Sequence, residues 1–233
     1  AGAQDRQRML TIPKIQAGTG LAPRDKLAAL GLKLAIATTN WPQYGARVVA
    51  GSAFPLPRAE AWLAHSGDAL HLLFAVTEDG IRAANSHDQD PVWQDSCVEL
   101  FLHPGAGEPG GYYNFEFSCV GKCLSAFGPD RHQRTPNPPA ALDAIVRQPS
   151  LGHEAFGYRP GIASWELQVR IPADSLSQHR ISQFDGREMR LNLYKCGDAL
   201  PEPHYLSWHP IRTEQPDFHR PECFGPVRFA YTE

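Results

Sequence analysis

An indole and a carboxylate lie six residues apart in the middle of the chain, in the stretch PVWQDSCVELFLHP (residues 91–104). Trp93 comes first, and Glu99 follows within an apolar run that includes Val98 and Leu100. A flat aromatic ring can cover the apolar face of a ligand, and a carboxylate accepts strong charge-assisted hydrogen bonds from hydroxyl groups. A strand that only fills a core needs neither group. The stretch therefore predicts a strand that binds a ligand.

The strand that carries Glu99 pairs with a second one in our interpretation. Residues 95–102 and 112–119 form an antiparallel hairpin across a loop rich in Gly and Pro, and centring the loop near residue 108 places Leu100 opposite Glu116. Alternation along the first strand puts Val98, Leu100 and Leu102 on a core face and Glu99 on the other. A carboxylate among aromatic side chains needs a hydrogen-bond partner, which an internal group or a ligand could supply.

The rest of the chain reads as short strands separated by turns. Gly (20 residues) and Pro (21 residues) are frequent, which favours many turns over long helices. We expect an all-β fold, a single-domain β-sandwich of the jelly-roll type with one or two short helices. The expected helix spans 24–36, a helical turn lies within 173–180, and residues 79–92 and 129–141 are expected loops. Strands are expected at 59–78 (a hairpin), 95–103, 111–121, 122–128, 142–150, 163–172, 189–198, 205–212 and 226–231.

Charge and hydropathy exclude two classes of partner. The formal net charge is −3, so the chain has no basic surplus with which to neutralise the phosphates of a nucleic acid. No apolar run approaches the ~18 residues of a membrane-spanning helix. We expect a leader or tether at residues 1–22, a single domain at 23–233, and a monomer. The first residues could remain after cleavage of a secretory signal, which predicts a secreted or periplasmic protein, or could be a remnant of cloning.

The five cysteines contain no Cys-x-x-Cys pair, which argues against a zinc ribbon. Cys97 lies opposite Cys119 in the expected register. The two could form a cross-strand disulfide in an oxidising compartment, or remain small buried apolar side chains.

Four segments together resemble carbohydrate-binding modules of family 9. They are PVWQDSCVELFL (91–102), EAWLAHSGDALHLLFAVTEDGIRA (60–83), ASWELQVRIPADSL (163–176) and the tail SWHPIRTEQPDFHRPECFGPVRF (207–229). The resemblance extends from about residue 45 to 231. It looks closest to a free-standing branch found in bacteria that use polysaccharides. It implies a β-sandwich related to the DOMON group.

The resemblance also implies a binding site. Better-known members hold the end of a sugar chain between two Trp rings, with an acid bonding hydroxyl groups. Carried over to this sequence, the first ring is Trp93 and the acid is Glu99. Phe218, beside His219, stands where the second Trp is expected, and a Phe offers less stacking area. Glu116 stands where the family has an Arg. The full set expected to bind carbohydrate is Trp93, Glu99, Phe218, His219, Asn114, Gln215 and Trp208, the last of which could instead plug the core.

Some members of this family bind calcium in loops. Asn85, Asp88 and Asp90 in the NSHDQD segment carry oxygen atoms of the kind that calcium prefers. These three residues are the predicted calcium ligands, and calcium is the one cofactor that the resemblance suggests.

Two other functions compete with non-catalytic carbohydrate binding. A glycoside hydrolase needs two carboxylates flanking the substrate, but the expected register points Glu99 and Glu116 to opposite faces. A haem- or metal-binding module of the DOMON type is the second alternative, because His204, His209 and His219 fall near one loop system. We therefore expect a module that binds a mono- or oligosaccharide.

Overall fold

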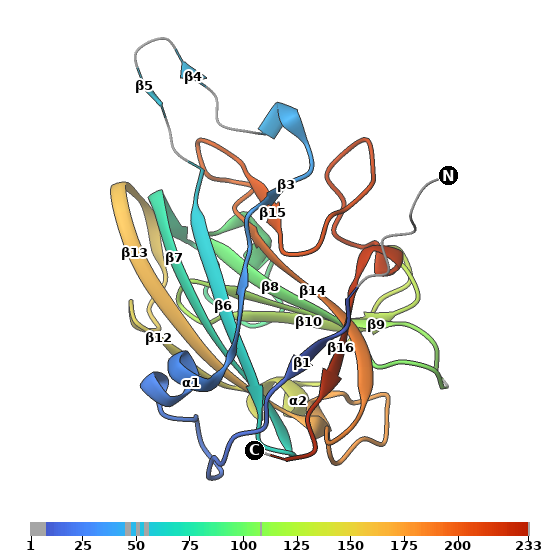
Figure 1. The fold of residues 1–233 in the computed structure, drawn as a ribbon. Helices are drawn as coiled ribbons and strands as arrows, with labels where there is room; N and C mark the ends of the chain where they lie inside the picture. The colour runs from blue at the N-terminus through green and yellow to red at the C-terminus, as the bar shows by residue number, and fades with distance from the viewer. Residues whose placement is uncertain (1–7, 45–47, 50–51, 54–55, 108, 233) are drawn as a thin grey trace.

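Two β-sheets lie face to face in the structure, a computed structural model that describes residues 8–44, 48–49, 52–53, 56–107 and 109–232 (Figure 1). The strands are β1 (Leu10–Ile12), β2 (Leu32–Ala35), β3 (Thr38–Thr39), β4 (Val48–Val49), β5 (Ser52–Ala53), β6 (Arg58–His65), β7 (Ala69–Ala83), β8 (Cys97–His103), β9 (Tyr112–Ser118), β10 (Cys123–Gly128), β11 (Thr135–Pro136), β12 (Val146–Pro149), β13 (Phe156–Pro172), β14 (Glu188–Cys196), β15 (Tyr205–Ser207) and β16 (Gly225–Phe229). The helices are α1 (Arg24–Leu30) and α2 (Pro139–Asp143), with 3-10 turns η1 (Pro42–Tyr44), η2 (Val92–Gln94), η3 (Ala173–Ser175) and η4 (Pro221–Cys223). The predicted all-β sandwich with short helices is confirmed.

The larger sheet runs in the order β1-β16-β14-β8-β9-β10-β11, and β15 joins β14 to β3. The smaller sheet runs β12-β13-β7-β6-β2. The main core fills the space between them, because each sheet turns one apolar face inward: Leu72 and Phe74 of β7 meet Leu100 and Phe115 of the larger sheet in one buried cluster. Burial of this apolar surface is the main term that stabilises the sandwich. No helix in the described ranges is both long and apolar enough to cross a bilayer.

The β8–β9 hairpin has a register one residue away from the predicted one. Glu99 pairs with Glu116 and Leu100 pairs with Phe115, so the expected pairing of Leu100 with Glu116 is wrong. Residues directly opposite each other in an antiparallel pair share a face. The predicted register would have put Glu116 in the core beside Leu100, whereas the observed one keeps Leu100 with Phe115 inside and both glutamates outside.

The cysteines stay reduced in this arrangement. All five are free thiols, and Cys97 and Cys119 lie on different faces of the larger sheet: Cys119 joins the main core, whereas Cys97 packs with Val92 and Cys196 on the outer face. The predicted alternative of a Cys97–Cys119 disulfide is therefore wrong. The other alternative, in which both cysteines are small buried side chains, is confirmed.

Local elements differ from the expected ones at several places, among them the expected strands 142–150 and 205–212, which are limited to Val146–Pro149 and Tyr205–Ser207. The helix ends at Leu30, and residues 32–35 form β2, which pairs with β6 and buries Leu34. The polar segment 79–92 is shorter than expected, because β7 continues to Ala83 against β13. The expected loop 129–141 contains β11 and the start of α2.

Part of the predicted leader belongs to the sandwich. Residues 10–12 form β1, which pairs in parallel with β16, and Lys14 makes an ion pair with Asp185 at 2.8 Å. Residues 1–7 lie outside the described residues.

Candidate functional site

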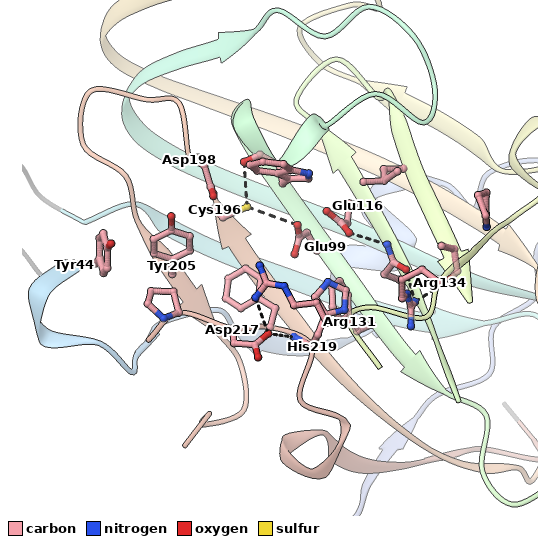
Figure 2. Close-up of a pocket in the computed structure, with 18 residues that line it drawn as sticks. Tyr44, Glu99, Glu116, Arg131, Arg134, Cys196, Asp198, Tyr205, Asp217 and His219 are labelled. Atoms are coloured by element: carbon pink, nitrogen blue, oxygen red, sulfur yellow. Dashed lines mark hydrogen bonds and ion pairs between the residues drawn. The ribbon is translucent and has the colours of Figure 1, made fainter. Parts of the chain in front are cut away.

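A cavity of about 560 Å³ opens on the outer face of the larger sheet (Figure 2). Its floor is made by β8, β9, β10 and β14, and its walls come from η1, η2 and three loops. A volume of this size is typical of sites for small molecules. The lining residues are Tyr44, Trp93, Glu99, Phe101, Asn114, Glu116, Leu124, Ala126, Arg131, Arg134, Pro136, Cys196, Asp198, Tyr205, Pro216, Asp217, Phe218 and His219.

The floor is polar because strand alternation turns these side chains away from the core. Glu99 of β8 and Asn114 and Glu116 of β9 all face the cavity, while their chain neighbours Leu100 and Phe115 face inward. All three polar side chains are at most 4 % exposed. Buried polar groups need hydrogen-bond partners, so the arrangement of this floor must satisfy each of them.

Trp93 stands at the mouth of the cavity. Its side chain is 38 % exposed, which is unusual for a large apolar residue beside a strand. The backbone beneath the ring is held in place, because its carbonyl oxygen accepts a hydrogen bond from the Asp198 amide at 3.1 Å and the preceding Val92 is fully buried. The structure thus presents an accessible indole on a held backbone at this point.

Glu99 and Glu116 lie side by side on the floor (Figure 2). The Oε1 atom of Glu99 accepts hydrogen bonds from the thiols of Cys97 at 3.8 Å and Cys196 at 3.7 Å. No N–H or hydroxyl group of the described chain donates to its Oε2 atom. A proton on Glu99 would satisfy this atom, because a protonated carboxyl group can hydrogen-bond to the neighbouring Glu116.

The protonation of this pair follows from its surroundings. Burial, with the nearby Cys196 and Glu116, holds the pKa of Glu99 well above its usual range. Burial also raises the pKa of Glu116, although the hydrogen bonds from Glu99 and Asn114 oppose that rise. Both shifts favour the protonated form, so the pair retains a proton to higher pH than a solvent-exposed carboxyl group does.

Arg134 extends this network to the cavity wall. Its guanidinium donates to the side-chain oxygen of Asn114, whose amide donates to Glu116 at 2.7 Å. The same guanidinium donates to the carbonyl oxygens of Gly128 and Tyr112 and lies 4.2 Å from the centre of the Tyr112 ring. This cation balances the acids of the floor without standing on the paired strand.

The opposite wall comes from the segment before η4. Asp217 makes ion pairs with Arg131 at 3.3 Å and Arg220 at 2.8 Å. Nδ1 of His219 is 2.8 Å from the hydroxyl of Tyr112. Burial and the nearby Arg134 lower the pKa of His219 to about 4, so its ring is neutral at pH 7.

Phe218 lines the cavity but is packed on one face. Its ring stacks on Tyr194 with centroids 4.1 Å apart and an interplanar angle of 9°. Tyr205 and Trp41 lie within 6.2 Å of it, and Tyr44 packs edge-on against Tyr205. Phe218 is thus part of an aromatic wall.

Two residues expected at the site lie elsewhere. Gln215 is exposed and is absent from the cavity lining; its backbone oxygen accepts a hydrogen bond from Thr213. Trp208 packs against the main core and beside His209, outside the cavity, which agrees with the core-plug alternative.

The residues predicted to bind calcium have partners within the protein. Both carboxylate oxygens of Asp88 bond to Arg147, at 2.7 and 2.9 Å, and the Asn85 amide donates to Asp95. Asp90 accepts from the backbone of His87. Calcium binding here stays a prediction, and it would require Asp88 to leave Arg147.

The three histidines considered as metal ligands do not gather. Nε2 of His204 lies 2.8 Å from the Lys195 ammonium group, and His219 contacts Tyr112. Among the described residues, the one group of His, Cys, Asp and Glu side chains close enough to share an ion is Cys97, Glu99 and Cys196. A shared site of the three histidines is therefore wrong.

Several lining residues were not foreseen from the sequence. The correct register would have placed Glu116 beside Glu99, so alternation within YYNFEFS carried that signal. Arg131 and Arg134 lie in a segment interpreted only as a loop, and Asp198 and Tyr205 flank the turn between β14 and β15. Nothing in their local sequence marks these loop residues as neighbours.

Asp198 gives the site a measurable response to pH. Burial raises the pKa of its carboxyl group from 3.8 to about 6. Between these values the folded chain keeps a proton that the unfolded chain has lost, so this group makes stability fall as pH rises from about 4 to about 6. We expect the unfolding free energy of the native chain to fall relative to that of Asp198→Asn over that interval in urea titrations, because the amide does not titrate. Parallel curves for the two proteins would contradict the assignment.

Comparisons with known proteins agree with this architecture. The sequence model of carbohydrate-binding family 9 matches residues 30–229. The structure is similar to that of a Bacteroides uniformis protein assigned as carbohydrate-binding, with 33% identity, a TM-score of 0.84, and coverage of 95% of this chain and 99% of that one. No curated protein matches.

Two further solved structures share the fold at low identity. Both are of a family 9 carbohydrate-binding module from Caldicellulosiruptor kristjanssonii. The complex with glucose has 14% identity, a TM-score of 0.54 and 97% coverage of both chains. The complex with cellotriose has 12% identity, a TM-score of 0.56, and coverage of 97% of this chain and 95% of that one. Because the family match spans most of the sequence, this chain belongs to carbohydrate-binding family 9.

Proposed function

We propose that the cavity binds a mono- or oligosaccharide, including the end of a chain, without chemical conversion. The observation that carries this proposal is that the exposed indole of Trp93 and the buried Glu99–Glu116 pair open into the same cavity. A sugar ring has apolar C–H faces and a rim of hydroxyl groups. The indole suits the face, and the carboxyl groups suit the rim.

The polar groups around the cavity can both donate and accept hydrogen bonds. The carboxyl oxygens of Glu99 and Glu116 offer acceptors on the floor, and each sugar hydroxyl needs both a donor and an acceptor. Arg131 adds a donor at the wall and Asp198 an acceptor. Phe218 and Tyr205 supply apolar contact opposite the polar floor.

The carboxyl pair supports binding over hydrolysis. In the observed register Glu99 and Glu116 share a face, so the prediction that they point to opposite faces is wrong. Glycosidases hold their two carboxyl groups about 5 to 9.5 Å apart with the scissile bond between them, whereas Glu99 and Glu116 are close enough to hydrogen-bond to each other. A sugar can lie over the pair but not between its members.

The relatives suggest which ligands to try first. The fold relatives were solved with glucose and with cellotriose, so β-linked glucose oligomers and their ends are the first candidates for this chain. A secreted or periplasmic location in a polysaccharide-using bacterium and a monomeric state complete the proposal.

A glycan array probed with the full chain tests the proposed function, followed by calorimetric titration with the retained glycans, glucose and cellotriose. We expect saturable binding at one site per chain, and no new reducing ends after prolonged incubation with the bound oligosaccharide. Retention of no glycan would contradict carbohydrate binding. Release of reducing ends would contradict a non-catalytic role.

A further inference from the structure

Three side chains with metal-ligating atoms meet beneath the floor of the cavity. The sulfur atoms of Cys97 and Cys196 lie 3.8 and 3.7 Å from Oε1 of Glu99, and all three ligand atoms fall within 4.8 Å of one another. Each residue is at most 2 % exposed. The carbohydrate site described above needs Glu99 but has no use for two thiols beside it.

The two sulfur–oxygen separations match those in a tetrahedral zinc site. Zinc lies about 2.3 Å from thiolate sulfur and about 2.1 Å from carboxylate oxygen, which at the tetrahedral angle puts sulfur and oxygen about 3.6 Å apart. The observed distances of 3.8 Å to Cys97 and 3.7 Å to Cys196 are close to this value. The spacing of each sulfur from the carboxylate oxygen therefore suits a single ion shared by the three residues.

Rigid strands set this arrangement. Cys97 and Cys196 are direct cross-strand partners in the β8–β14 pair, and Glu99 lies two residues along β8 on the same face. Both strands are central in the larger sheet, with neighbours on each side. Ligands held by paired strands are positioned more precisely than ligands held by loops.

A divalent ion bound here would replace the thiol protons, as metals do when they bind cysteine.

We propose that Cys97, Cys196 and Glu99 form a binding site for one Zn²⁺ ion, with a fourth coordination position open toward the cavity. Cys196 and Glu99 line the cavity, which gives the ion a route of entry. Two thiolates and one carboxylate favour a thiophilic ion such as Zn²⁺ over Ca²⁺ or Mg²⁺. The proposal stands on these three residues and does not depend on carbohydrate binding.

Titration of the fully reduced chain with Cd²⁺, a spectroscopic probe for zinc sites, tests this site in the absence of sugar. We expect a thiolate-to-metal absorption band that saturates at one Cd²⁺ per chain, disappears when Zn²⁺ competes, and is accompanied by proton release. Removing a residue that only hydrogen-bonds to a metal ligand costs about 10–100-fold in metal affinity. Cys97→Ser and Cys196→Ser each remove a ligand itself, so each should weaken Cd²⁺ binding by about 100-fold or more.

The matched control is Cys223→Ser, since Cys223 is half-buried and lies outside the cluster. This variant should keep the band and the stoichiometry of the native chain. Circular dichroism and thermal unfolding identify any variant that fails to fold, and Glu99→Gln, which keeps both thiols, then serves as the second ligand variant. The proposal is overturned if the reduced native chain shows no saturable band, or if Cys97→Ser and Cys196→Ser bind Cd²⁺ as the native chain does.

Discussion

Trp93→Ala is expected to weaken carbohydrate binding by about 30-fold or more while leaving the fold intact. Truncation of an aromatic side chain that the ligand buries costs about 2 kcal/mol or more of binding free energy. Each 1.4 kcal/mol of binding free energy corresponds to a tenfold change in affinity. The fold should survive because the ring is 38 % exposed and the backbone beneath it is held by Asp198 and by the buried Val92. Calorimetric titration gives the affinity, and urea unfolding gives the stability.

The matched control is Trp62→Ala. Trp62 is half-buried on the smaller sheet, where the ammonium group of Lys33 lies 5.3 Å from its ring, and it is absent from the cavity. This variant should bind the sugar as tightly as the native chain. If Trp93→Ala binds normally, or if it loses binding only because it unfolds, Trp93 is not the platform for the ligand.

The second large effect concerns a buried charge in the larger sheet. The Lys195 side chain is inaccessible, and its ammonium group lies 3.3 Å from Glu78, 2.8 Å from the carbonyl oxygen of Cys196 and 2.8 Å from Nε2 of His204. Burial and Lys195 hold the pKa of His204 well below its usual range, so the neutral ring accepts a hydrogen bond from the ammonium group. The indole N–H of Trp165 also donates a hydrogen bond to the Glu78 carboxylate at 2.9 Å.

Lys195→Met should lower the free energy of unfolding by about 3–5 kcal/mol, because it leaves the Glu78 carboxylate buried without its counter-charge. The double variant Lys195→Met, Glu78→Leu should recover most of that loss, since it removes both charges. Chemical denaturation of the three proteins measures the effect. A loss below about 1 kcal/mol in the single variant would show that this ion pair does not stabilise the fold as its burial requires.

The fold was largely predictable from local sequence pattern. Alternation in RAEAWLAH and CVELFLH identifies β6 and β8, because a half-buried strand needs an apolar residue at every second position. The predicted helix at 24–36 is too long, because LKLA (32–35) fits either a helix or a strand. Its pairing with β6 makes it a strand in the structure. Short apolar runs of this kind are set by tertiary contacts that the local pattern does not contain.

The candidate site was predictable only in part. Trp93 and Glu99 stand out by residue type, and the resemblance to the family explains why they occur together. Arg134 does not stand out, since its role depends on a loop that returns 20 residues after Asn114 to meet its side chain. The one-residue error in register hid the Glu99–Glu116 pair, because a slip of one residue moves every side chain of a strand to the other face.

A crystal structure of the chain with the tightest glycan from the array is the most direct test that Trp93 and Glu99 serve one ligand. The account predicts a sugar ring stacked on the Trp93 indole, with a hydroxyl group within hydrogen-bond distance of Glu99 or Glu116. The smaller sheet carries another hollow, lined in part by Arg58, Thr77 and Glu166. A sugar bound there, with nothing against Trp93, would contradict the account.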